Sequence, residues 1–245
     1  MPYRLFNLDE VAKYLHLTPE DVTKRVKDGV IPFEKRGERF VFRKSDIDLW
    51  ASRRILALPE PRLADYHQKF RQSHPEISAD EAILSELLTR GAIDSAMTAK
   101  TKASLLRDIV DLADKTKQVC SPRELVESLV QRESLGSTAV PGGLALLHPR
   151  VHEPYMFTAS FLVVGRSMQE IHFGAPDGHP TTLFVLLCCQ DDRSHLHTLA
   201  RLCLMALTTE MLAQLRQAPD AKSMLDCLLA AEQAVLSRAK SKRRD

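Results

Sequence analysis

Long apolar runs are missing from this sequence. No stretch approaches the roughly 18 apolar residues that a membrane-spanning helix requires. The first residues, Met1–Glu10, contain neither a long apolar segment nor a small-residue cleavage site, so they do not look like a secretory signal. We therefore expect a cytoplasmic protein that makes no membrane contact.

Cysteine is also scarce. The five cysteines are an odd number at irregular spacings, and no two of them form a Cys-x-x-Cys pair. This pattern argues against a disulfide framework and against a structural zinc site. Buried, reduced thiols are the expected state.

Charge is nearly balanced, with 34 lysines and arginines against 32 aspartates and glutamates. Bulk electrostatics therefore does not indicate a nucleic-acid coat protein or a membrane-surface binder, and any such activity must come from a local patch. The length of 245 residues exceeds one average domain of roughly 100 to 200 residues, so two domains are expected.

Residues 1–56 carry the signals of a small helical domain with a hairpin. A helix over Leu8–Leu15 is followed by a second helix that Thr18 caps and Gly29 ends. Two short alternating segments flank Gly37 and predict a β-hairpin, after which Ser45 opens a third helix. This order of elements is the layout of a winged helix-turn-helix domain.

Three motifs here resemble the excisionase and MerR-like family of DNA-binding domains: Leu8–Leu15, Gly29–Pro32, and Arg39–Arg43 followed by Ser45–Trp50. The resemblance implies a recognition helix over Glu20–Asp28 and a wing at the hairpin. Acidic side chains dilute the positive charge, so a merely solvated face is the alternative, and tight DNA binding would need dimerisation. The side chains expected to reach DNA are Thr23, Lys24 and Lys27 on the helix and Lys35, Arg36 and Arg39 on the wing.

Residues 57–91 predict a helical connector. Leu63–Ser73 has helical apolar spacing, and Ser78–Glu81 is a capping segment for a second helix that ends at Gly91. The apolar positions are too numerous for a free linker. Packing on a domain and pairing of two chains into a homodimer are both explanations for them.

Strand and helix signals alternate in residues 92–237, which indicates a layered α/β domain and, with the first domain, an α+β or α/β fold class. Residues 132–140 are expected to form a loop, and the basic residues 238–245 a solvated tail that could add weak phosphate affinity. The expected strands are Leu144–Leu147, Phe157–Gly165 and Thr181–Cys189, and the expected helices Thr101–Lys115, Ser121–Val130, His195–Leu207, Glu210–Gln217 and Ala221–Leu236.

The second domain contains the residue types that phosphoryl transfer to a histidine requires. His148 ends an apolar run, and its imidazole is a neutral nucleophile near pH 7. Arg132 offers a fork of donors to phosphoryl oxygens, and His195 offers a second imidazole. Ser137 and Thr138 offer hydroxyl groups. Because such transfer needs mainly positioning and charge neutralisation, this set would suffice without a metal.

The segments that contain these residues, in their order along the chain, resemble the IIA domain of the fructose/mannitol class of the bacterial sugar phosphotransferase system. This class includes the nitrogen-regulatory IIA proteins. The resemblance implies a mixed central sheet flanked by helices, with His148 as the phosphorylated residue, Arg132 as the site arginine and His195, not His197, as the second histidine. The motifs that carry it are Arg132–Glu133, Gly136–Thr138, Gly143–His148 and His195–Leu196, together with the turn Asp177–Pro180.

One position departs from the family's pattern. Leu147 stands where the family has proline before the histidine, and Pro149 follows instead, which could change the aim of the imidazole. A metal site built from His148, His152, His195 and His197 is an alternative, but their spacing fits no standard ligand motif. Neither a metal nor a cofactor is therefore expected.

The leading interpretation is a phosphotransferase-linked regulator that binds DNA and accepts a phosphoryl group from an HPr-like phosphohistidine carrier. One alternative is a phosphotransfer component that passes the group to a IIB partner. Another is a IIA-like protein that takes no phosphate and regulates only by binding a partner.

Overall fold

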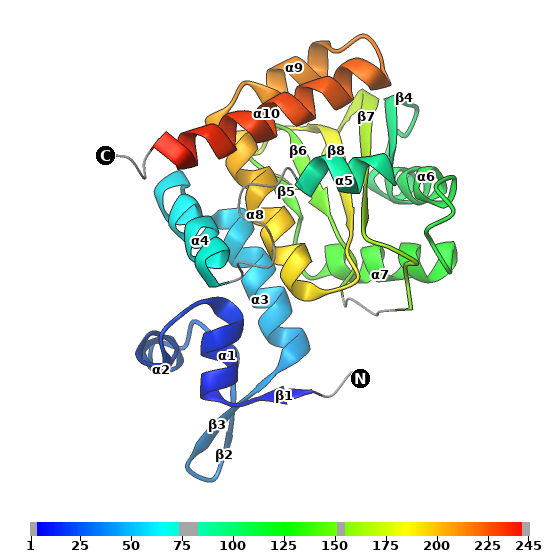
Figure 1. Cartoon of the computed structure of the whole chain (residues 1–245). Helices are drawn as coiled ribbons and strands as arrows, with labels where there is room; N and C mark the ends of the chain where they lie inside the picture. Colours follow the sequence, from blue (N-terminus) through cyan, green and yellow to red (C-terminus); the bar gives the residue numbers. More distant parts are fainter. Residues whose placement is uncertain (1–3, 74–82, 151–154, 242–245) are drawn as a thin grey trace.

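The computed structural model describes residues 4–73, 83–150 and 155–241 (Figure 1). Its N-terminal unit packs three helices on a small antiparallel sheet of order β1-β3-β2. This is the helix, helix, hairpin, helix order that the sequence predicts. The elements are β1 (Leu5–Phe6), α1 (Leu8–Leu15), α2 (Pro19–Lys27), β2 (Glu34–Arg36), β3 (Arg39–Arg43) and α3 (Lys44–Ala57).

Local capping explains where the first helices begin and end. Asn7 and Glu10 form a reciprocal capping box at the start of α1, and Thr18 accepts a hydrogen bond from the N–H of Asp21 at the start of α2. Gly29 follows α2 at φ 66°, and Gly37 turns the hairpin at φ 62°, a region that glycine adopts without strain.

The connector forms two helices that pack on the C-terminal unit: α4 (Glu60–Ser73) on α8 (Asp192–Thr208), and α5 (Ile83–Thr89) on β7 (Phe161–Ile171) and α10 (Ala221–Ser241). Packing within the chain therefore accounts for buried apolar residues such as Leu63 and Leu84. The predicted capping segment at 78–81 lies outside the described residues.

A buried polar network joins these helices. Arg201 of α8 donates from Nε to Nε2 of His67 on α4 at 2.8 Å and pairs with Glu232 of α10 at 2.6 Å. Both side chains of the ion pair are fully buried. The Glu232 carboxylate also accepts the N–H of Leu84, the second residue of α5. The network therefore ties four helices together at one point.

The C-terminal unit is a mixed five-stranded sheet of order β4-β7-β8-β6-β5. The β4–β7 and β6–β8 pairs are parallel, and the β7–β8 and β5–β6 pairs are antiparallel. This mixed sheet, flanked by helices, is the layered fold that the sequence predicted. Its remaining strands are β4 (Ala92–Met97), β5 (Ala139–Val140), β6 (Leu144–Leu147) and β8 (Thr181–Cys188).

Helices cover both faces of the sheet (Figure 1). Alternate strand residues face opposite ways: Leu146 and Val185 point toward α8, whereas Leu147 and Leu186 point toward α6 (Lys102–Asp114) and α7 (Pro122–Ser134). The short helix α9 (Met211–Gln217) lies on the α8 side. Within the described residues, no helix is both long and apolar enough to cross a membrane.

Several boundaries differ from the sequence expectations. The strand expected over 157–165 is β7, which begins at Phe161 and continues to Ile171 through polar residues. Helix α7 continues through Ser134, into the segment predicted as loop, and α10 continues through Ser241, into the basic run. Helix-forming residues such as Arg, Lys, Gln and Ala extend both helices without adding to the apolar pattern on which the predictions relied.

Candidate functional site

His148 stands at the end of β6, a fully buried strand of the sheet. All four β6 residues are buried, and the strand lies between β8 and β5. A tight turn connects β5 to β6, in which Gly142 and Gly143 adopt φ values of 88° and 73° that favour glycine. Because side chains alternate along a strand, His148 faces the α8 side of the sheet, opposite to Leu147.

The hydrogen bonds of His148 define its tautomer. Nδ1 lies 2.9 Å from the carbonyl oxygen of Leu146, which can only accept, so Nδ1 carries the proton. Nε2 accepts a hydrogen bond from Nε of Arg132, also at 2.9 Å. Both contacts describe a neutral imidazole whose Nε2 lone pair faces a guanidinium. This is the arrangement of a nitrogen nucleophile beside a cation.

Arg132 belongs to the last turn of α7 and is only 1% exposed. Its Nη1 donates to the carbonyl oxygen of Gly136 at 2.9 Å, whereas its buried Nη2 has no hydrogen-bond partner among the described residues. Burial lowers the pKa of Arg132 to about 10, with nearby Glu133 opposing and Arg53 adding to that effect. A desolvated cation with an open donor is suited to receiving an anionic oxygen.

His195 comes from the first turn of α8. Asp191 caps this helix by accepting the N–H of Ser194, which fixes the turn that carries the histidine. The rings of His195 and His148 lie with their centroids 4.7 Å apart. His197 instead stacks on His67 at 4.8 Å, as expected for residues two apart on a helix, which do not share a face.

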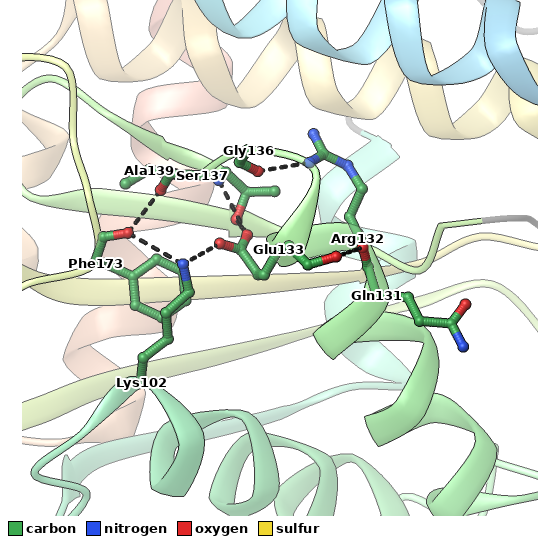
Figure 2. A network of polar contacts seen from close by, with 10 residues as sticks. Lys102, Gln131, Arg132, Glu133, Gly136, Ser137, Ala139 and Phe173 are labelled. Carbon is green, nitrogen blue, oxygen red and sulfur yellow. Dashed lines mark hydrogen bonds and ion pairs between the residues drawn. The ribbon is translucent and has the colours of Figure 1, made fainter.

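Ser137 and Thr138 lie in a separate polar network, which Figure 2 shows around Glu133 and Lys102. The Ser137 hydroxyl donates to the carbonyl oxygen of Phe173 at 2.8 Å, and that of Thr138 donates to Glu133. Lys102 pairs with the same Glu133 carboxylate group at 2.6 Å. Since each hydroxyl has a single proton, neither donates to a phosphoryl oxygen in this arrangement. The structure thus brings together three of the five predicted residues.

The histidine pair and Arg132 offer a nucleophile, a second ring and a cation, but not a cation-binding cluster. Among the described residues, no group of three or more His, Cys, Asp or Glu could hold a metal ion. His152, which the alternative metal site would need, lies outside them. The arrangement is therefore suited to holding an anion rather than a metal.

Comparisons with known proteins identify the families of both units. Residues 86–231 match the family described as phosphoenolpyruvate-dependent sugar phosphotransferase system, EIIA 2. The chain belongs to this family. Residues 5–55 match a helix-turn-helix domain family, as the N-terminal fold indicates.

Individual relatives are similar to this chain over its IIA domain. The chain is 33% identical over 120 residues to the nitrogen regulatory protein of Escherichia coli (strain K12), covering 48% of this chain and 71% of that protein. It is 25% identical over 147 residues to the fructose-specific EIIABC component of Bacillus subtilis (strain 168), covering 59% of this chain but only 23% of that protein. The nitrogen regulatory protein IIA-Ntr of Neisseria meningitidis has the same fold, with a TM-score of 0.54, 23% identity, and coverage of 60% of this chain and 99% of that one.

The helix-turn-helix unit presents its predicted DNA side chains on the surface. Lys24 and Lys27 are exposed on α2, and the cationic wing residues Lys35, Arg36 and Arg39 are exposed on β2 and β3. Arg36 pairs with Glu34 at 3.3 Å. The Thr23 hydroxyl donates to the carbonyl oxygen of Pro19 at 2.8 Å, so its proton is already used. Helix α2, predicted as the recognition helix, and the β2–β3 hairpin, predicted as the wing, both lie at the end of the molecule away from the IIA sheet (Figure 1).

Two contributors near the IIA site were not predicted from the sequence. Ser52 of α3 places Oγ 3.4 Å from Nε2 of His195, and Arg53 lies beside the Gly136 loop. Both belong to the helix-turn-helix unit, so no motif of the IIA domain could point to them. Lys102 and Glu133 were also missed as a pair, because 31 positions of chain separate them; only the adjacency of Arg132 and Glu133 gave a signal.

Proposed function

We propose that this protein is a regulator whose IIA domain accepts a phosphoryl group on Nε2 of His148 and whose helix-turn-helix unit binds DNA. The observation that carries the proposal is the lone pair of Nε2, which faces Arg132 while the buried Nη2 of that arginine keeps an open donor. A phosphoryl group bonded to Nε2 would displace the present Arg132 contact. The guanidinium would then donate to the phosphoryl oxygens.

The departure at Leu147 does not weaken this proposal. Leu147 ends β6 in register with Leu186 of β8, and the carbonyl of the preceding residue fixes the imidazole through Nδ1. Backbone pairing with β8 supplies the extended geometry that proline would otherwise favour. The ring is therefore oriented toward Arg132 with leucine in this position.

The donor would be a phosphohistidine carrier of the HPr kind, acting in the cytoplasm without metal or cofactor on the acceptor. The transfer forms the Nε2–P bond of His148 as the carrier's N–P bond breaks, and the carrier histidine keeps the released electron pair. The bound group would add about −1.5 to −2 charges beside Arg132. Passage onward to a IIB partner is the second candidate, which the membership of the family supports.

Labelling of the intact protein tests the phosphoryl acceptor. The protein is incubated with labelled phosphoenolpyruvate, enzyme I and an HPr-type carrier. We expect label that is lost in acid and stable in base, as for phosphohistidine, and mass spectrometry should map it to the peptide that contains His148. If the protein takes up no label although the carrier is phosphorylated, the result would instead support a protein that regulates only by binding a partner. Label that moves to added IIB would support the second candidate.

If α2 binds DNA, removing its lysines should weaken the dependence of DNA affinity on salt concentration. The double variant Lys24→Ala/Lys27→Ala should bind duplex DNA more weakly, and the slope of log K against log salt should decrease by about 1 for each lysine that contacts a phosphate. Fluorescence anisotropy with labelled random-sequence DNA at several salt concentrations measures this slope. The exposed Lys222 of α10 provides the control variant Lys222→Ala, which should bind as the unchanged protein does. Equal slopes for all three proteins would contradict DNA binding through α2.

A further inference from the structure

Helix α3 of the helix-turn-helix unit lies over the histidine pair of the IIA domain. Ser52, only 3% exposed, places its hydroxyl oxygen 3.4 Å from Nε2 of His195. The next residue, Arg53, lies against the loop that holds the site arginine: a Cβ atom built on Gly136 would be 3.1 Å from its Nη2. Because the carbonyl of Gly136 binds Arg132, one helix contacts the surroundings of both site residues.

Contacts with α8 hold α3 in this position. Lys44, the first residue of α3, forms ion pairs with Asp48 in its own helix and with Asp192, the first residue of α8. Further along, Ile55 of α3 and Leu199 of α8 belong to one hydrophobic cluster. The two helices, which run side by side in Figure 1, are therefore held by an ion pair at their N-terminal ends and by apolar side chains beyond it.

The site residues beside this contact are almost fully buried. His148, His195 and Arg132 are 2%, 1% and 1% exposed. Phosphoryl transfer requires the donor phosphorus to reach the nucleophile in line, at about 3 to 3.5 Å. A phosphohistidine on a carrier brings the carrier surface with it, and α3 lies against this site through the contact of Ser52 with His195.

We propose that α3 is a removable cover of His148, and that a phosphohistidine carrier competes with it for the same face of the IIA domain. This inference rests on the proposed phosphoryl transfer to His148. The apparent affinity for the carrier falls in proportion to the fraction of molecules in which α3 is displaced. Conversely, by linkage, a bound carrier releases the helix-turn-helix unit from the IIA domain.

Displacement of α3 by a substitution tests the cover. Ser52→Arg in the full chain introduces a long cation into the buried contact with His195, near Arg53 and Arg132, and should open it. Ala57→Arg adds the same side chain to an exposed position of α3 and serves as the matched control. Asp192→Lys is a second opening variant, because it places a lysine against Lys44. Circular dichroism selects the variants that keep the native fold.

Two readouts separate access from transfer. Carbethoxylation of His148 by diethyl pyrocarbonate, followed by mass spectrometry, reports exposure of the imidazole without any carrier. The initial rate of labelling by a phosphorylated HPr-type carrier reports transfer. We expect both rates to rise about ten- to a hundredfold in Ser52→Arg, the effect of overpacking a closed contact. They should also rise in Asp192→Lys, where a like-charge contact replaces the ion pair with Lys44, and stay unchanged in Ala57→Arg.

The outcomes are distinct. Faster carbethoxylation in Ser52→Arg and Asp192→Lys, with no labelling of any variant, would uphold the cover and overturn the proposed function. Unchanged carbethoxylation in both folded variants would overturn the cover. Faster carbethoxylation with labelling no faster than that of the unchanged protein would show that the carrier does not compete with α3. If Ser52→Arg does not fold, Asp192→Lys alone decides between these results.

Discussion

Arg132→Ala should slow the transfer of a phosphoryl group to His148 by about 100- to 1000-fold, the effect of removing one donor to a developing anion. The guanidinium donates directly to Nε2 of the acceptor at 2.9 Å, and its buried Nη2 is open to a phosphoryl oxygen. Alanine removes both donors and the charge that would neutralise the incoming group. Single-turnover labelling with an excess of phosphorylated carrier measures the rate, with His148→Ala giving the background.

Two further variants test the interpretation. Arg132→Lys keeps a positive charge but lacks the fixed fork of donors, so its rate should lie between those of Arg132→Ala and the unchanged protein. Arg123 belongs to the same helix, and its side chain is 90% exposed, so Arg123→Ala should transfer at the full rate. An Arg132→Ala protein that is folded and labelled at the full rate would assign this arginine a purely structural role.

Arg201→Met should lower the free energy of unfolding by about 3 to 5 kcal/mol, the effect of removing one partner of a buried ion pair. Glu232 would then remain in the core without its cation. Burial already raises the pKa of Glu232, and Arg201 is the principal group that opposes this rise. His67 would also lose the donor that Nε of Arg201 provides. Urea unfolding followed by circular dichroism measures the change.

The double variant Arg201→Met/Glu232→Gln is the informative control. Glutamine removes the unpaired charge but keeps an oxygen that can accept the N–H of Leu84. The double variant should therefore recover part of the stability lost in Arg201→Met. Its loss of unfolding free energy should be smaller than the sum of the losses in the two single variants. If the double variant were as unstable as the sum of the two single variants, the ion pair would not be the source of the loss.

Periodicity and capping predicted most of the elements correctly. Thr18, Thr101 and Ser121, which stand at the predicted starts of three helices, are N-caps whose side chains accept backbone N–H groups. These signals are local, since a cap and the helix that it starts lie within a few residues. The short strands β1 and β5 and the half-buried β4 were not predicted, because their residues show neither a clear alternation nor a continuous apolar run of four or more.

The site was predictable to the extent that it follows from motifs. His148, Arg132 and His195 meet as the resemblance implied, whereas Ser137 and Thr138 bond to Phe173 and Glu133 instead. The direction of a hydroxyl group depends on its neighbours in space, which the order of motifs does not record. The contact of Ser52 with His195 was unpredictable for the same reason, since it joins residues of different domains.

The hydrophobic cluster on the α8 side of the sheet has a consequence for the chain when it is cut. It extends from Phe6 of the helix-turn-helix unit, through α4, to Val235 of α10 without dividing into two. A fragment that ends within the connector would expose apolar surface from both halves at once, and such surface promotes aggregation. Proteolysis between residues 57 and 91 would therefore favour aggregation of the two pieces over release of a free helix-turn-helix unit and a free IIA domain.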